Sequence, residues 1–233
     1  MTDLPALGII LLTYGGTDAR RRYARRTLET ALGLIRYDGP IHVHIADDGS
    51  PEQHAERLAD LARGSEGVTA VSVSNAERGG YGRNYNLATQ VVHELCPVVL
   101  PLEDDWELQR DLDIAALLPA FTDGRVGCIR LGYVGWTQPL RGEFYEAPDA
   151  RKYLILDPAS PERHVFSGHP RLETRAWARA VGPWPEGLAP GETEFVVAGW
   201  PAARQHVAWP LDLVRTSGDM FGHIGTVRST EDE

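Results

Sequence analysis

Three consecutive carboxylates, Glu103, Asp104 and Asp105, directly follow the apolar run VVLPL. Like charges at this spacing raise one another's pKa and destabilise a fold unless a cation lies among them. A divalent ion such as Mg²⁺ binds carboxylate oxygens and often shares its coordination sphere with a phosphate. The alternative is a solvated acidic turn at the end of a strand, and the triplet alone does not decide between the two.

Polar residues also end two other apolar runs. Thr13 and Tyr14 end the run that starts LGIILL, and Asp47 and Asp48 follow IHVHIA. In a parallel sheet the carboxyl ends of the strands share one edge, where ligands gather. Three polar clusters in one crevice would be unfavourable without a cationic or hydrogen-bonding ligand. Their positions therefore favour a binding site over a solvated turn.

The elements that must place these residues alternate along the first half of the chain. Apolar periodicity predicts strands at 7–13, 41–46, 68–73 and 97–102, with helices at 18–36, 51–63 and within 79–95. This β-α-β-α-β-α-β order with short loops predicts an α/β fold with a mainly parallel central sheet flanked by helices.

Local signals around the second predicted strand and helix are specific. Ser50 is expected to be the helix N-cap, with Gln53 completing a capping box, and Gly64 is expected to end the helix. His42 and His44 share one face of the preceding strand. We expect them to bind neighbouring polar groups rather than a metal.

The second half of the chain is less regular. Residues 126–132 predict another strand, and 133–165 predict loops or short hairpins. Residues 170–181 and 192–204 each predict a helix. The tail at 227–233 is polar.

Composition excludes some functions. Hydrophobic residues make up 42% of the chain and charged residues 24%, which is typical of a globular protein. The net charge of −10 makes a nucleic-acid partner unlikely, because duplex binding needs a basic face. Cys96 and Cys128 are expected to be buried free thiols. The run LGIILL is too short to span a bilayer and lacks signal-peptide flanks, which predicts a soluble cytoplasmic protein without a transmembrane segment.

Six segments, taken in order, resemble the family 2 glycosyltransferases with the GT-A fold. They are IILLTY, IADDGS, GGYGRNYN, LPLEDDW, SGHPRLETRAWARAVGPWPEG and GETEF. No single segment is specific, but the series covers nearly the whole chain. The resemblance implies one catalytic domain at 1–226, with a nucleotide-binding half at 1–106 and an acceptor-side half at 107–226.

The resemblance also implies roles at the nucleotide. Asp48 would hydrogen-bond the nucleotide base, and Thr13 and Tyr14 would form a wall of the base pocket. Arg83 would approach the diphosphate or the base, in a loop whose glycines allow close backbone approach.

At the acidic triplet, the resemblance implies that Asp105 binds Mn²⁺ or Mg²⁺ directly. Asp104 would lie near the ribose or the metal, and Glu103 would be more peripheral. His223, in DMFGHIG, would reach the metal or the diphosphate. The commonest motif of the family has a neutral residue between two aspartates, so the EDD order departs from it.

Glu192 in GETEF is the expected general base, and Glu194 is the second candidate. Helical spacing puts Glu192 on the same side as Phe195, Val196 and Gly199, which we expect to face the core. Glu194 would then lie about 200° further round the helix.

The resemblance implies a metal-dependent, inverting glycosyltransferase of the hexosyltransferase type, with a UDP-sugar as the expected donor and an unidentified acceptor. Two alternatives stay open: an inactive GT-A domain that binds a sugar nucleotide or a partner, and a nucleotidyltransferase. The segment TYGGTDARRR lacks the spacing of a nucleotidyltransferase phosphate loop. Trp106 and Trp136 are candidates for stacking on sugar rings, whereas Trp184 and Trp200 are expected in the core.

Overall fold

The computed structural model describes residues 4–51, 53–75, 77–132, 140–161, 165–213 and 220–226. Its elements in chain order are β1 (Leu7–Thr13), α1 (Asp18–Leu34), β2 (Ile35–Arg36), β3 (Ile41–Asp47), α2 (His54–Arg63), β4 (Val68–Asn75), α3 (Gly80–Leu95), β5 (Val98–Glu103), β6 (Trp106–Leu108), β7 (Leu112–Asp113), the 3₁₀ helix η1 (Leu118–Thr122), β8 (Cys128–Arg130), β9 (Gly142–Glu146), β10 (Lys152–Leu156), β11 (Arg171–Thr174), α4 (Arg175–Val181), α5 (Pro190–Ala198), α6 (Pro201–Arg204), β12 (Val207–Pro210) and β13 (Phe221–His223).

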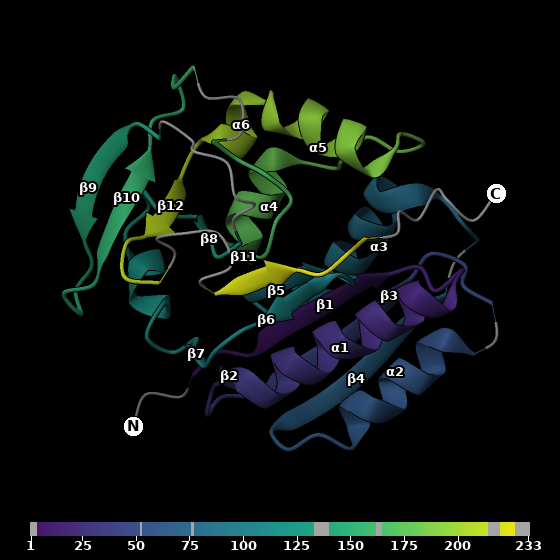
Figure 1. Cartoon of the computed structure of the whole chain (residues 1–233). Coiled ribbons are helices and arrows are strands. Elements are labelled where there is room, and N and C mark those ends of the chain that lie inside the picture. The colour runs from purple at the N-terminus through teal and green to yellow at the C-terminus, as the bar shows by residue number, and fades with distance from the viewer. Residues whose placement is uncertain are drawn as a thin grey trace.

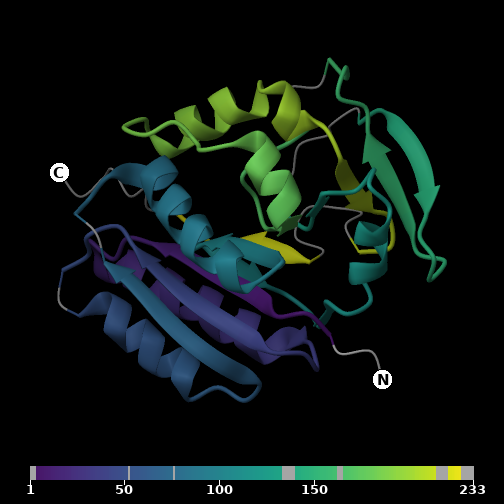
Figure 2. The same cartoon turned by 180° about the vertical axis from the view of Figure 1, so that it is seen from behind.

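A nine-stranded sheet forms the centre of the protein, in the order β4-β3-β1-β5-β11-β8-β12-β10-β9 (Figure 1). The first four strands in this order are parallel to one another. Helices α1 and α2 cover one face of this half, and α3 covers the other (Figure 2). The sequence therefore predicts this half correctly, since strands buried on both faces appear as continuous apolar runs.

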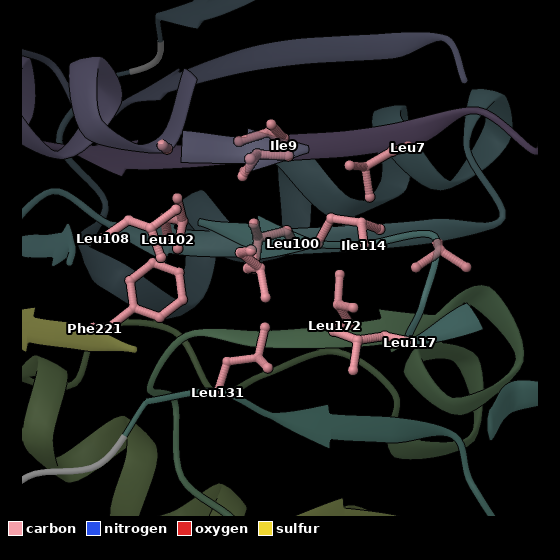
Figure 3. Close-up of a cluster of buried hydrophobic side chains, with 14 of the residues drawn as sticks. Leu7, Ile9, Leu100, Leu102, Leu108, Ile114, Leu117, Leu131, Leu172 and Phe221 are labelled. Atoms are coloured by element: carbon pink, nitrogen blue, oxygen red, sulfur yellow. The ribbon is translucent and has the colours of Figure 1, made fainter. Parts of the chain in front are cut away.

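The two faces of β1 belong to separate cores. Ile9 and Leu11 pack with residues of α1 and α2, whereas Ile10 and Leu12 pack with residues of α3. Figure 3 shows how the first of these cores continues beyond the parallel strands, to Leu172 of β11 and Phe221 of β13. This apolar layer brings the two halves of the chain together.

The second half of the sheet corrects one prediction. Residues 170–181 were expected to form a single helix, but Arg171–Thr174 form β11, and α4 starts only at Arg175. Strand β11 pairs antiparallel with both β5 and β8, with Glu173 opposite Val99. Pairing at the centre of the sheet overrides the local helical pattern.

The structure also corrects the prediction of a single helix at 192–204. These residues form two helices, α5 and α6, with Gly199 and Trp200 between them. Pro201 occupies the first turn of α6, where its missing N–H is tolerated, and it cannot continue the preceding helix. The expected hairpins within 133–165 are confirmed in part, because β9 and β10 pair antiparallel. Trp136 and the tail at 227–233 lie outside the described residues.

The predicted cap of α2 is wrong. The helix begins at His54, its N-cap is Gln53 with a φ of 56°, and no described side chain caps it. Ser50 instead closes the preceding loop, because its hydroxyl accepts a hydrogen bond from Gly15 N at 2.7 Å and donates one to Asp47. The predicted stop at Gly64 is confirmed.

The predicted polar partners of the strand histidines are confirmed. His42 Nε2 lies 2.7 Å from Ser72 Oγ. His44 uses both ring nitrogens, at 2.7 Å from Ser72 Oγ and 3.0 Å from Ser74 Oγ. Cys96 and Cys128 are buried free thiols, as expected. Over the ranges that the structure describes, no helix has the length and apolar character needed to cross a membrane.

Candidate active site

The polar strand ends meet at one edge of the sheet. Strand β1 lies between β3 and β5, with Thr13 opposite Asp47 and Leu12 opposite Glu103. The predicted co-location of the polar clusters is therefore confirmed. Strand β13 adds to this edge from the far end of the chain, because its pairing with β6 places His223 opposite Trp106.

Asp104 is almost fully occupied by protein donors. Its side chain is 1% exposed and accepts hydrogen bonds from Thr13 Oγ1 at 2.9 Å and from Tyr14 N at 3.1 Å. Its second oxygen pairs with the guanidinium of Arg20. Burial raises the pKa of Asp104 to about 6, and Arg20 opposes that rise. Asp104 therefore holds β1, α1 and β5 together, and its oxygens have little capacity left for a ligand.

Asp105 differs from its neighbour because one of its oxygens is unused. Its Oδ2 accepts a hydrogen bond from Arg20 Nη1 at 3.1 Å and lies 3.5 Å from His223 Nε2. Its Oδ1 is buried and has no hydrogen-bond partner among the described residues. Burial alone would raise the pKa of Asp105, but His223 and Arg20 hold it below its usual value. Asp105 is therefore an ionised carboxylate with one oxygen available.

Asp105 and His223 are the residues that fit a divalent metal. A carboxylate oxygen is a preferred ligand of Mg²⁺ and Mn²⁺, and an imidazole nitrogen suits Mn²⁺ less strongly. Within the described ranges, no three His, Cys, Asp or Glu side chains form a complete metal site. A metal held here would therefore need further ligands from a bound molecule and from water.

Arg20 is a site residue that the sequence analysis does not single out. It lies in the first turn of α1, whose N-cap Thr17 accepts a hydrogen bond from Arg20 N at 3.2 Å. Its buried guanidinium contacts both Asp104 and Asp105. The positive charge that the acidic triplet requires is thus supplied in part by the protein itself. Only the packing of α1 against the end of β5 could reveal this.

A cavity of about 180 Å³ opens beside the triplet, between the ends of β1 and β3 and the start of α3. Its lining includes Tyr14, Asp48, Arg78, Tyr81, Asn84 and Glu103. The carboxylate of Asp48 accepts hydrogen bonds from Gly79 N at 2.7 Å and Gly80 N at 3.0 Å. Gly80 has a φ of +81°, which glycine adopts without strain. Asp48 therefore fixes the loop that forms one wall of the cavity.

Arg78 in this loop and Arg83 near the start of α3 have different positions. The guanidinium of Arg83 donates to Glu77 O at 3.2 Å, and Arg83 is not among the described lining residues of the cavity. Arg78 lines the cavity, with its guanidinium 4.0 Å from the centroid of the Tyr14 ring and a 3.1 Å hydrogen bond to the Tyr14 hydroxyl. Of these two arginines, Arg78 is the one that lines the cavity.

The structure also corrects the prediction of which face of α5 is buried. Phe195 and Val196 were expected to face the core, but they are 43% and 38% exposed. The buried face consists of Thr193, Val197 and Ala198. Residues 195–198 are all apolar, so their spacing does not identify a buried side, and contact with α3 and α6 decides it.

This rotation reverses the orientations that the sequence predicted for Glu192 and Glu194. Glu192 is exposed, and its carboxylate accepts a hydrogen bond from Ala189 N at 3.2 Å, as in a capping box. Glu194 points inward, where a Cβ on Gly168 would overlap its Oε1. Burial raises the pKa of Glu194, and the backbone N–H of Gly168 and the charge of Arg171 oppose that rise. The carboxylate at the crevice is therefore that of Glu194.

Glu103 completes the acidic cluster. Burial raises its pKa well above the usual value, and the charge of Glu194 raises it further. Trp106 is 2% exposed, with its ring centroid 5.0 Å from that of His169 and 5.1 Å from that of His223. It is therefore part of the core and cannot stack on a sugar ring without rearrangement. Trp184 is buried as expected, and Trp200 is partly exposed.

The model of glycosyl transferase family 2 matches residues 9–182. The chain belongs to glycosyl transferase family 2. Comparison with curated proteins gives no match. The family 2 assignment is based on about three quarters of the chain, which includes the acidic triplet and most residues that line the cavity.

Solved structures show that this family 2 chain has the GT-A fold. The S. aureus protein TarS (residues 1–349) in complex with UDP is 15% identical with a TM-score of 0.65, over 97% of this chain and 62% of that one. GalNAc-T7 with UDP, GalNAc and Mn²⁺ is 16% identical with a TM-score of 0.58, over 90% of this chain and 43% of that one. The mannosyltransferase PcManGT from Pyrobaculum calidifontis, in complex with GDP-Man and Mn²⁺, is 15% identical with a TM-score of 0.50, over 89% of this chain and 57% of that one. The chain thus spans less than two thirds of each of these proteins.

Proposed function

We propose that this chain is a metal-dependent, inverting glycosyltransferase that moves a sugar from a nucleoside diphosphate to an acceptor hydroxyl. The observation that carries the proposal is the unpartnered Oδ1 of Asp105, beside a cavity lined by Asp48 and Tyr14. A buried carboxylate oxygen without a partner is unfavourable unless a ligand uses it. Membership of family 2 and the nucleotide complexes of the similar structures support the same conclusion.

The cavity is the proposed site of the nucleotide base. Tyr14 and Arg78 present planar groups on which a base can stack, and Asp48 holds the glycine backbone close to them. We propose UDP as the nucleotide, since UDP is the ligand in two of the similar structures. The diphosphate would then extend toward Asp105.

Asp105 and His223 would hold Mn²⁺ or Mg²⁺. A bound divalent ion neutralises the negative charge that develops on the departing diphosphate. Arg20 keeps Asp105 ionised and oriented, with its Nη1 3.1 Å from Asp105 Oδ2. His223 contributes from β13, and its hydrogen bond to Asp105 raises its own pKa.

Glu194 is the proposed general base. Its carboxylate lies in the same buried cluster as Glu103 and Asp105, and burial raises its pKa toward the range that favours proton transfer at neutral pH. It would accept the proton of the acceptor hydroxyl as that oxygen attacks the anomeric carbon. One base without a covalent intermediate gives inversion.

The test is calorimetric titration with UDP and GDP, with and without Mn²⁺, followed by hydrolysis assays on the corresponding sugar nucleotides. We expect Mn²⁺ to tighten nucleotide binding at least tenfold. In Asp105→Asn, the effect of Mn²⁺ should disappear and turnover should fall about 10²–10³-fold, while the fold remains intact by circular dichroism. Nucleotide binding without any hydrolysis or transfer would indicate an inactive domain, and no nucleotide binding would refute the proposal.

A further inference from the structure

Two buried oxygens near the proposed base have no partner. The hydroxyl of Tyr81 and Oε1 of Glu194 are inaccessible to solvent, and neither forms a hydrogen bond within the described part of the chain. Leaving one such group unpaired costs about 1–3 kcal/mol, so most buried polar atoms in proteins are paired. Two unpaired oxygens in one place therefore indicate a ligand.

Gly168 shows that the two oxygens are neighbours. A Cβ on Gly168 would overlap Oε1 of Glu194 and would lie 3.0 Å from the Tyr81 hydroxyl. Both oxygens thus lie against one point of the backbone, yet they do not bond to each other. A hydroxyl group between them can donate to the carboxylate and accept from the tyrosine at the same time.

The position of Tyr81 connects this pair to the nucleotide cavity. Tyr81 lines the cavity together with Arg20, Glu103 and Asp104. Its ring packs edge-on against Trp184, with the centroids 5.5 Å apart, and this contact fixes the direction of the hydroxyl. The hydroxyl is therefore held between the site of the nucleotide and the carboxylate that we propose as base.

An unpaired tyrosine hydroxyl alone would not indicate a site. The hydroxyl of Tyr153 on β10 is also buried without a partner in the described ranges, but Tyr153 is not among the described residues that line the cavity. Tyr81 differs because a carboxylate oxygen lies beside its hydroxyl and because its side chain lines the cavity.

We propose that Tyr81 is a positioning residue for the attacking hydroxyl group. This inference rests on the proposed function. The attacking oxygen donates its proton to Oε1 of Glu194 and accepts a hydrogen bond from Tyr81, which directs its remaining lone pair at the anomeric carbon. The new bond forms from this oxygen to the anomeric carbon, the bond to the diphosphate breaks, and its electron pair leaves with the diphosphate. The proton stays on Glu194.

The test uses water as the attacking hydroxyl, because the acceptor is unidentified. Hydrolysis of UDP-glucose, UDP-N-acetylglucosamine and GDP-mannose is measured for wild type, Tyr81→Phe and the matched control Tyr153→Phe. We expect Tyr81→Phe to lower kcat about tenfold, the usual worth of one hydrogen bond, with KM for the sugar nucleotide and Kd for the nucleotide within twofold of wild type. Tyr153→Phe should change none of these values.

Other results separate the explanations. A raised KM with unchanged kcat would overturn the assignment, because Tyr81 would then contact a hydroxyl of the transferred sugar. Unchanged kcat and KM would mean that Tyr81 and Glu194 share only a structural water molecule. If the wild-type protein binds a nucleotide but hydrolyses none of the three donors, the proposed function fails first, and this inference fails with it.

Discussion

Arg20 Nη1 donates a hydrogen bond to Asp105 Oδ2 at 3.1 Å, from a guanidinium that also pairs with Asp104. A single buried cation thus serves two neighbouring carboxylates. It leaves Oδ1 of Asp105 without a partner among the described residues. The protein therefore compensates part of the negative charge of the triplet itself, and one oxygen of Asp105 is left for a metal.

Removing this cation should destabilise the protein in a way that metal can reverse. In Arg20→Gln, the free energy of unfolding should fall by about 3 kcal/mol, because two buried carboxylates lose their partner. Millimolar Mn²⁺ should restore more of this stability in the variant than it adds to wild type. Urea unfolding with and without Mn²⁺ measures both effects.

The control for this prediction is Arg26→Gln on the same helix. Arg26 pairs with Glu107 at the surface, so its loss should change stability by less than about 1 kcal/mol, with no dependence on Mn²⁺. If Mn²⁺ stabilises wild type and Arg20→Gln equally, then Arg20 and the metal do not compensate the same carboxylates.

Replacing Glu194 and Glu192 one at a time should show which of the two glutamates is the general base. Glu194→Gln should lower turnover roughly 10²–10⁴-fold, the usual share of a general base, with nucleotide binding nearly unchanged. Glu192→Gln should have a much smaller effect, because Glu192 is exposed and caps α5. Steady-state hydrolysis and nucleotide titration of both variants test this ranking, and a reversed ranking would return the role to Glu192.

A methyl group at Gly168 should have an effect similar to loss of the base. In Gly168→Ala, the new Cβ would overlap Oε1 of Glu194, so the carboxylate must move away from the crevice. We expect turnover to fall at least tenfold while nucleotide affinity stays within twofold, because a small misplacement of a catalytic group is enough.

Gly191→Ala on α5 is the matched control for Gly168→Ala. A Cβ at Gly191 meets no atom within 4 Å in the described structure, so kinetics should match wild type. Wild-type turnover in Gly168→Ala would show that Glu194 need not occupy this position during catalysis.

Asp48 should affect nucleotide binding through the loop that it holds. Asp48→Ala should weaken UDP binding by about 1.5–3 kcal/mol, because Gly79 N and Gly80 N lose their charged acceptor. Asp48→Asn keeps one acceptor oxygen and should lose less. Titration calorimetry compares the two variants, and equal losses would indicate a direct contact of the carboxylate with the base.

The contribution of His44 to stability should fall as the pH drops below about 6.5. Burial lowers the pKa of His44 to about 4, so between pH 6.5 and 4 the unfolded chain binds a proton that the folded protein excludes. The stability that neutral His44 contributes is therefore fully present above pH 6.5. It declines by up to about 1.4 kcal/mol per pH unit as the pH falls toward 4.

Urea unfolding between pH 4 and 7 measures this slope. His44→Gln should reduce the slope of the unfolding free energy against pH by up to about 1.4 kcal/mol per pH unit. His42 and His54, whose pKa values burial also lowers, should keep their own contributions to the slope. The exposed His206, with a φ of 60° that asparagine tolerates, provides the control His206→Asn. An unchanged slope in His44→Gln would mean that the folded protein accommodates the charged imidazole.

The sequence by itself determined the parallel half of the fold. Strands such as LGIILLT and VVLPLE are apolar on both faces, and they end in polar residues at short loops. Because parallel strands place their carboxyl ends on one edge, the order of elements was enough to predict that Thr13, Asp48 and the acidic triplet share a crevice.

Only the tertiary structure decided which side chains face that crevice. Residues 171–174 have a helical pattern but pair with β5, and the apolar residues 195–198 leave the rotation of α5 undetermined until α3 and α6 pack against it. The place of Arg20 depends in the same way on the contact between α1 and the end of β5. These choices depend on contacts between residues far apart in the chain, and local periodicity carries no information about such contacts.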